Sequence, residues 1–248
     1  MKALKFISLL FIPILVLSSC KKDNDEEPTP TPTPVKETNL IINLYYNVDG
    51  ENVFFDTIHY FNEAGNNYSI SKLQYYLSAF KFIKSDGTPV QKDDVFYVDI
   101  RDQSTNKITF KNFTEGNYTG IQFILGLDSA HNITNALPNT IENINMAWPD
   151  PMGGGYHFMK LEGHFYSGTS TFGYAMHLGL NPYKIDIDLN KSFNATKDIN
   201  NNITLNMNIN EWFKNPQIYD FNVDGNYSMG NMAAMMKLTM NGKDIFNE

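Results

Sequence analysis

Cysteine is nearly absent from this sequence, with Cys20 the single one among 248 residues. A lone cysteine excludes a disulfide within the chain and a metal site built from several thiolates. The fold must therefore be stabilised by packing of apolar side chains. These are abundant, since 42% of the residues are hydrophobic and 14% are aromatic.

Apolar runs long enough to span a bilayer are also missing. The longest run, residues 6–17, follows Lys2 and Lys5 and has the length of a secretion signal rather than of a membrane helix. The next residues, Leu17-Ser18-Ser19-Cys20, resemble a bacterial lipobox. The resemblance implies cleavage before Cys20 and a lipid anchor on its sulfur, which leaves no cysteine for catalysis. The alternative is an ordinary signal peptide with a chance cysteine.

Clusters of basic residues are missing too, and the formal net charge is −8. This charge argues against nucleic acid as a partner. Residues 21–37 are acidic and then rich in Pro and Thr, a composition typical of an extended spacer. The acidic cluster resembles the signal that sends lipoproteins of Bacteroidota to the cell surface; a tether facing the periplasm is the alternative. We therefore expect a lipid-anchored protein of the outer membrane.

The predicted organisation has three parts: a signal peptide at 1–19, the lipidated cysteine and linker at 20–37, and one globular domain at 38–248. Within this domain, short apolar runs and strict alternation recur, and long helical patterns are missing. The strand patterns lie at residues 40–46, 73–83, 95–100, 120–125, 156–165, 171–178, 184–189 and 203–209. They predict an all-β fold, an antiparallel β-sandwich or jelly roll. Two short helices are expected near the C-terminus, around 211–213 and across 231–240.

Enzyme signatures are missing as well. The sequence has no Gly-x-Ser-x-Gly elbow, no Walker loop and no His-Glu-x-x-His motif. We therefore predict a binding protein rather than an enzyme. A surface module that binds glycans or mediates adhesion is one hypothesis, because aromatic rings on an anchored β-sandwich can serve as stacking platforms.

Five histidines are present, and four of them fall between residues 131 and 177 together with several methionines. The histidines are His59, His131, His157, His164 and His177. Imidazole and thioether are ligands that suit copper. On a strand, His157 and Met159 would share a face, and His164 would lie on the other face unless a bulge intervenes. The alternative is that these side chains only fill the core or the surface.

Several short motifs in a fixed order resemble the MbnP-like copper-binding proteins of the cell envelope. The motifs are Gly126-Leu127-Asp128-Ser129-Ala130-His131-Asn132, Met146-Ala147-Trp148-Pro149, Met152-Gly153-Gly154-Gly155-Tyr156-His157-Phe158-Met159-Lys160-Leu161-Glu162-Gly163 and His177-Leu178-Gly179. Residues 80–87 and the segments 220–222, 229–231 and 241–246 add to the resemblance, which is that of the Bacteroidota branch and spans about residues 38–248.

The resemblance implies a β-sandwich that holds one copper ion through histidines. It also implies a ligand made from tryptophan, kynurenine, and a dihaem peroxidase-like partner enzyme that makes it. Carried over by motif, the candidate ligands are His131 and His177, with Trp148 as the kynurenine candidate near both. Trp148 lies eight residues before Tyr156, farther than in the methanotroph type. This departure makes His157, with Met152 or Met159, a candidate replacement ligand.

Two further segments have metal-ligand character. Asp220, Asn222 and Asp224 with Gly225 match the first half of an EF-hand calcium loop, although the twelfth position lacks a glutamate. The alternative is a polar turn. Farther on, Met229, Met232, Met236 and Met240 would share one face of a helix. Packing of that face on the sandwich is the favoured interpretation, and a soft Cu(I) site is the alternative.

Overall fold

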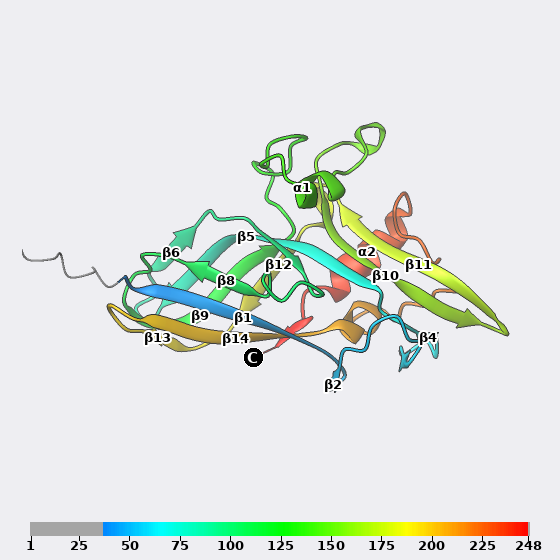
Figure 1. Ribbon diagram of the computed structural model, residues 1–248, viewed down its shortest axis with the longest axis horizontal. Coiled ribbons are helices and arrows are strands. Elements are labelled where there is room, and N and C mark those ends of the chain that lie inside the picture. The colour runs from blue at the N-terminus through cyan, green and yellow to red at the C-terminus, as the bar shows by residue number, and fades with distance from the viewer. Residues whose placement is uncertain (1–36, 248) are drawn as a thin grey trace, which may run out of the picture. The chain divides into compact units, whose positions relative to one another are not determined.

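The computed structural model describes residues 37–247. The predicted signal peptide, the candidate lipidation site Cys20 and nearly all of the linker lie outside these residues. The described part is built mainly of β-strands, and the prediction of an all-β sandwich is confirmed. Figure 1 shows the strands of one sheet crossing in front of those of the other.

The smaller sheet has five strands. They run in the order β15-β14-β1-β2, with β8 also paired to β1. The strands are β1 (Asn39–Val48), β2 (Glu51–Asn52), β8 (Lys107–Phe110), β14 (Asn200–Asn208) and β15 (Phe246–Asn247). The pairing of β1 with β14 is parallel, an exception within the predicted antiparallel sandwich. A parallel pair needs a long connection, and here most of the domain lies between the two strands.

The larger sheet has ten strands, and its central path is β12-β9-β5-β10-β4-β3. The strands are β3 (Tyr60–Phe61), β4 (Asn67–Tyr68), β5 (Lys72–Lys84), β6 (Pro89–Lys92), β7 (Phe96–Asp99), β9 (Gly116–Leu125), β10 (His157–Ser167), β11 (Ser170–Gly179), β12 (Ile185–Leu189) and β13 (Phe193–Ala195). In β12 the buried Ile185, Ile187 and Leu189 alternate with exposed Asp186 and Asp188. This period of two puts one face on the core and the other in water.

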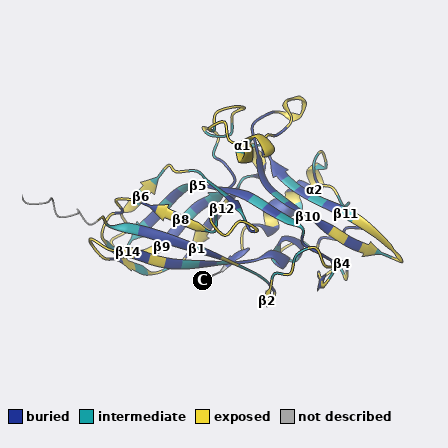
Figure 2. Cartoon of the chain, in the orientation of Figure 1, coloured by how far each residue is buried: buried dark blue, intermediate teal, exposed yellow. Residues whose placement is uncertain are grey.

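Aromatic rings fill the space between the sheets. Phe80 of β5 lies 5.0 Å from Phe110 of β8, and Phe123 of β9 lies 5.3 Å from Phe246 of β15, measured between ring centroids. Each pair joins one sheet to the other, and edge-to-face packing of this kind stabilises a core beyond the area it buries. Figure 2 shows the central strands buried and the hairpin ends exposed.

Helices are short in the described residues. The α-helices are α1 (Ile141–Asn145) and α2 (Met232–Asn241), and the 3-10 helices are η1 (Asp150–Met152), η2 (Asn181–Tyr183) and η3 (Ile209–Phe213). The two expected C-terminal helices correspond to η3 and α2, whereas α1 was not expected. Thr140 and Asn231 cap α1 and α2 by accepting a backbone N–H. None of the helices within residues 37–247 is long and apolar enough to cross a membrane.

Helix α2 packs on the domain with the face opposite to the expected one. Ala234, Met235 and Leu238 are buried, while Met232, Met236 and Met240 face solvent. The expectation that the methionine face docks on the sandwich is therefore wrong. The sequence does not determine which face is buried, because methionine and alanine occur on both faces of the helix.

Candidate metal centre

The β10–β11 hairpin positions His177 beside an acidic side chain. Only Gly168 and Thr169 connect the two strands, so the turn determines the register. His177 pairs directly with Lys160, and Ala175 pairs with Glu162. His177 and Glu162 are therefore diagonal neighbours on one face, within reach of each other.

A bulge in β10 brings His157 to the same face. The pairing of β10 with β11 is irregular between His157 and Met159, and an extra residue reverses the alternation of side chains. The His157 ring lies 5.0 Å from the His177 ring. Met159, adjacent to Lys160, points to the other face, where it is fully buried. The expectation that His157 and Met159 share a face is therefore wrong, and Met159 is a core residue.

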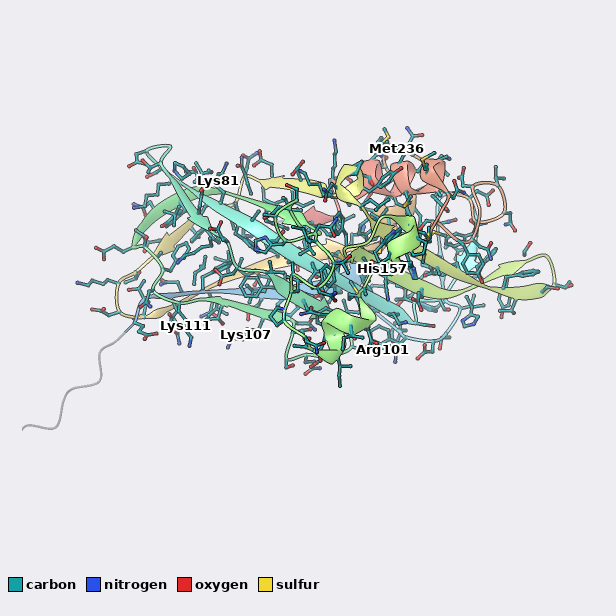
Figure 3. All side chains as sticks on the ribbon, turned by 90° about the horizontal axis from the view of Figure 1, so that it is seen from above. Lys81, Arg101, Lys107, Lys111, His157 and Met236 are labelled. Atoms are coloured by element: carbon teal, nitrogen blue, oxygen red, sulfur yellow. The ribbon has the colours of Figure 1, made fainter. Side chains whose placement is uncertain are left out.

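Trp148 completes a row of three rings, of which Trp148 and His157 are buried and His177 is partly exposed. Its centroid lies 4.8 Å from that of His157, and its indole N–H donates to the carbonyl oxygen of Met152 at 3.2 Å. A Cβ at Gly179 would come within 2.3 Å of the indole, so only glycine leaves room for the ring there. The structure thus brings Trp148, His157 and His177 together (His157 is labelled in Figure 3).

The electrostatics of His157 are those of a neutral imidazole. Burial is the main cause that lowers its pKa to about 3, and the neighbouring side chains of Lys160 and His177 add to the shift. Its Nδ1 lies 3.2 Å from the carbonyl oxygen of Met146. A carbonyl only accepts, so Nδ1 carries the proton and Nε2 carries a lone pair. That buried Nε2 has no hydrogen-bond partner in the described part of the chain.

His177 is oriented by a carboxylate. Its Nε2 lies 3.0 Å from Oε1 of Glu162, whose Oε2 binds the ammonium of Lys72 at 2.9 Å. The hydrogen bond from His177 is the main cause that lowers the pKa of Glu162 to about 2, and Lys72 adds to it. Glu162 is therefore ionised, accepts the Nε2 proton and leaves Nδ1 of His177 with the lone pair. Glu162 was not among the predicted site residues, although the register of the hairpin points to it.

His131 lies on the loop after β9, with its side chain one-third exposed. Its Nδ1 lies 3.0 Å from both oxygens of Asp128. The loop is attached to the segment before His157, since Asn132 accepts the N–H of Tyr156 at 2.9 Å. No hydrogen bond or ring contact joins His131 to His157 or His177 within residues 37–247.

The remaining two histidines lie away from this row. His59 is exposed and bonded to Glu51 at 3.2 Å. His164 is exposed on β10. Neither contacts Trp148 in the described residues. Among residues 37–247, no cluster of three or more His, Cys, Asp or Glu side chains is arranged to hold a metal ion. The row therefore supplies two imidazoles, and any further ligand must come from another group.

The calcium candidate is a polar turn. Asp220 accepts hydrogen bonds from the backbone N–H of Asn222 and from the amide of Asn66. Asp224 accepts the ammonium of Lys237 at 2.7 Å. Because a lysine already neutralises Asp224, the calcium interpretation finds no support here.

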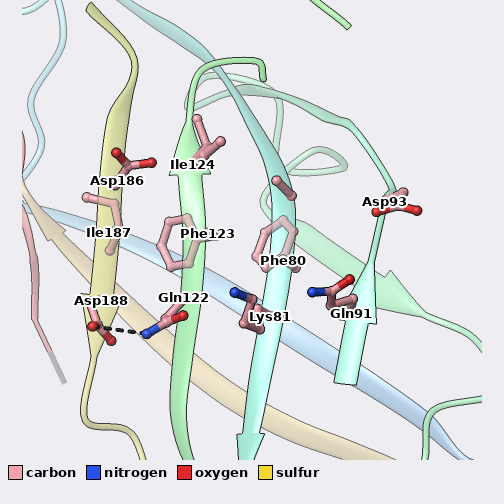
Figure 4. Close-up of a pocket in the computed structure, with 11 residues that line it drawn as sticks. Phe80, Lys81, Gln91, Asp93, Gln122, Phe123, Ile124, Asp186, Ile187 and Asp188 are labelled. Carbon is pink, nitrogen blue, oxygen red and sulfur yellow. Dashed lines mark hydrogen bonds between the residues drawn. The ribbon is translucent and has the colours of Figure 1, made fainter. Parts of the chain in front are cut away.

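A cleft of about 500 Å³ lies over the larger sheet and holds none of the predicted site residues (Figure 4). Polar side chains from β5, β6, β9 and β12 line it, among them Lys81, Gln122 and Asp188, the last two hydrogen-bonded at 3.1 Å. The rings of Phe80 and Phe123 beneath it are buried in the core. This cleft therefore offers no aromatic stacking platform to a glycan.

Comparison with known proteins connects this architecture to one family. The model of the MbnP family matches residues 37–233. The solved structure of MbnP from Methylosinus trichosporium is similar to this chain with a TM-score of 0.55 and 14% identity, covering 86% of this chain and 98% of that one. At this identity the likeness shows the fold alone. A comparison with curated proteins found no match. Since the family model covers most of the described domain, the chain belongs to the MbnP family.

Proposed function

We propose that this protein binds copper through His157 and His177 at the cell envelope, and that it sequesters or delivers the metal rather than catalysing a reaction. The observation that carries the proposal is the buried Nε2 of His157, a lone pair without a partner in the described residues. Leaving a buried acceptor unsatisfied costs roughly 1–3 kcal/mol. A metal ion would bind that lone pair and remove the cost.

The outer partners of the imidazoles support this role. Histidines that ligate metals usually give their second ring proton to a carboxylate or a backbone carbonyl. His157 gives it to the carbonyl of Met146, and His177 to Glu162. His131 has the same arrangement with Asp128. We therefore propose His131 as a third ligand, supplied by its loop.

Burial keeps a nitrogen of His157 free for a metal ion, and the type of ligand favours a cation of intermediate softness. Because the pKa of His157 is about 3, protons do not compete for its nitrogen at neutral pH. Imidazole nitrogens without carboxylate ligands favour copper over calcium or magnesium. Family membership points the same way, since the resemblance of the motifs to MbnP-like proteins implies copper held by histidines.

Trp148 remains a packing residue as long as it is unmodified, because indole has only an N–H donor and no free lone pair. Its place beside His157 is compatible with the kynurenine ligand that the family resemblance implies. The dihaem peroxidase-like partner stays part of this proposal. So does membrane attachment through Cys20, which would hold the domain at the outer membrane.

The proposal is tested by titrating the metal-free protein with copper in the presence of a competing chelator. One ion should bind, and His157→Ala and His177→Ala should each weaken binding by more than about 100-fold, the upper range for loss of an outer partner. His59→Ala and His164→Ala are matched controls on exposed histidines and should leave the affinity unchanged. Equal affinity in all four variants would overturn the proposal.

A further inference from the structure

The exposed methionines of the described chain gather at one place. Ten methionines are described, and four are exposed: Met152 (37%), Met232 (72%), Met236 (48%) and Met240 (36%). Three belong to α2, at successive i, i+4 positions, so their side chains follow one line along the helix. Figure 3 shows Met236 on the outer side of this helix.

Met152 joins this line from a different part of the chain. Its terminal methyl lies 3.7 Å from the position that a Cβ of Gly230 would take. Gly230 precedes Asn231, which caps α2. The methyl end of Met152 therefore lies against the segment that leads into α2, two residues before Met232.

The basic side chain of α2 is already held by neighbouring groups. Lys237 is the basic residue of α2, and its ammonium is held by Asp224 and by the carbonyl of Ile218. Ala233, next to Met232, is exposed and apolar. The patch thus presents uncharged soft donors, which suit a soft monovalent cation and not a hard divalent one.

We propose that Met152, Met232 and Met236 form a second metal site, selective for Cu(I), on the outer face of α2. Thioethers of i, i+4 methionines are close enough to share one ion, and the side chain of methionine is flexible enough to adjust to it. Met240 extends the same line by one turn.

The structure also connects this thioether site to the imidazoles. The carbonyl of Met152 accepts the indole N–H of Trp148, and the hydroxyl of Ser228 donates to the carbonyl of His177 at 2.6 Å. Met152 and the segment that leads into α2 are therefore each hydrogen-bonded to a residue of the row. A role as the first capture point for copper follows, and that role, unlike the site itself, rests on the proposed function.

The test uses Ag(I), a redox-inert substitute for Cu(I), and the full chain labelled with ¹³C at the methionine methyls. One equivalent should shift the methyl signals of Met152, Met232 and Met236 and leave those of the buried Met146, Met207 and Met235 in place. The variant Met152→Leu/Met232→Leu/Met236→Leu keeps the apolar volume and should lose this equivalent. Met235→Leu, on the buried face of the same helix, is the matched control.

Two results would overturn the thioether site: no shift of the three exposed methyls, or unchanged Ag(I) binding in the triple variant. The outcome is separable from that of the imidazole centre. In His157→Ala/His177→Ala, the methyl shifts should persist. In the triple leucine variant, copper should still bind the imidazoles but load more slowly from a Cu(I) donor; an unchanged loading rate would contradict the capture role alone.

Discussion

Two regions of this molecule resemble metal sites in the sequence. In the structure they differ in whether other groups of the protein already bind their donor atoms. In the turn at Asp220 and Asp224, the carboxylates are already bound by backbone N–H groups and by Lys237. In the row of Trp148, His157 and His177, one buried nitrogen has no partner within the described residues. Ligand type alone therefore does not identify a metal site. The test is whether the protein itself already satisfies the lone pairs.

The largest expected effect is a loss of folding stability in acid, caused by the buried imidazole of His157. Unfolded His157 takes up a proton below its ordinary pKa of 6.5, while folded His157 stays neutral down to about 3. The unfolded state thus binds more protons in this window, and stability falls as the pH falls from 6.5 towards 3. Between pH 6.5 and 4.5, the metal-free protein should lose about 2–3 kcal/mol through this group.

Urea unfolding at the two pH values measures this loss. In His157→Gln, which keeps an amide donor for Met146 but does not titrate, the loss should be smaller by about that amount. His164→Gln, at an exposed position of the same strand, should lose as much as the unaltered protein. An equal loss in both variants would show that His157 is not held neutral by the fold.

The substitution Glu162→Gln tests whether copper affinity depends on the partner of the second imidazole, His177. The carboxylate of Glu162 fixes the tautomer of His177, and loss of such an outer partner weakens metal binding about 10–100-fold. Competitive copper titration at pH 7 measures it. Glu51→Gln, beside the exposed His59, provides the matched control and should have no effect. An unchanged affinity in Glu162→Gln would mean that His177 does not depend on this carboxylate.

The smallest effect is expected at the turn. Calcium at millimolar concentration should leave the Tm unchanged, and Asp224→Asn should cost about 1 kcal/mol or less, as for other partly exposed ion pairs. Lys237→Gln should cost a similar amount, because it removes the other half of the same pair. A calcium-dependent rise of Tm in Lys237→Gln would contradict the interpretation as a turn.

The sequence predicts strands better than it predicts which of them pair. Alternation such as that of residues 185–189 identifies the strand and its buried face. The parallel pairing of β1 with β14 is not visible in the sequence, because periodicity indicates the face of a strand and not its neighbour. The buried face of α2 was predicted wrongly for a related reason. Apolar residues occur all round this helix, so packing against the sandwich determines which face is buried.

The candidate site was predicted in part. His157, His177 and Trp148 were named from their motifs, and the structure brings these three together. Met159 was misplaced because one extra residue in β10 reverses the alternation, and a bulge leaves no clear sequence signal. Glu162 was missed, although the two-residue turn of the hairpin places it diagonally from His177.

The most direct test of the central claim is the position of copper in crystals of the copper-loaded protein, located by anomalous scattering at the copper edge. The account predicts a peak bonded to Nε2 of His157 and Nδ1 of His177, with Glu162 still on the far nitrogen of His177. A strong peak elsewhere, with Nε2 of His157 left without a ligand, would contradict it.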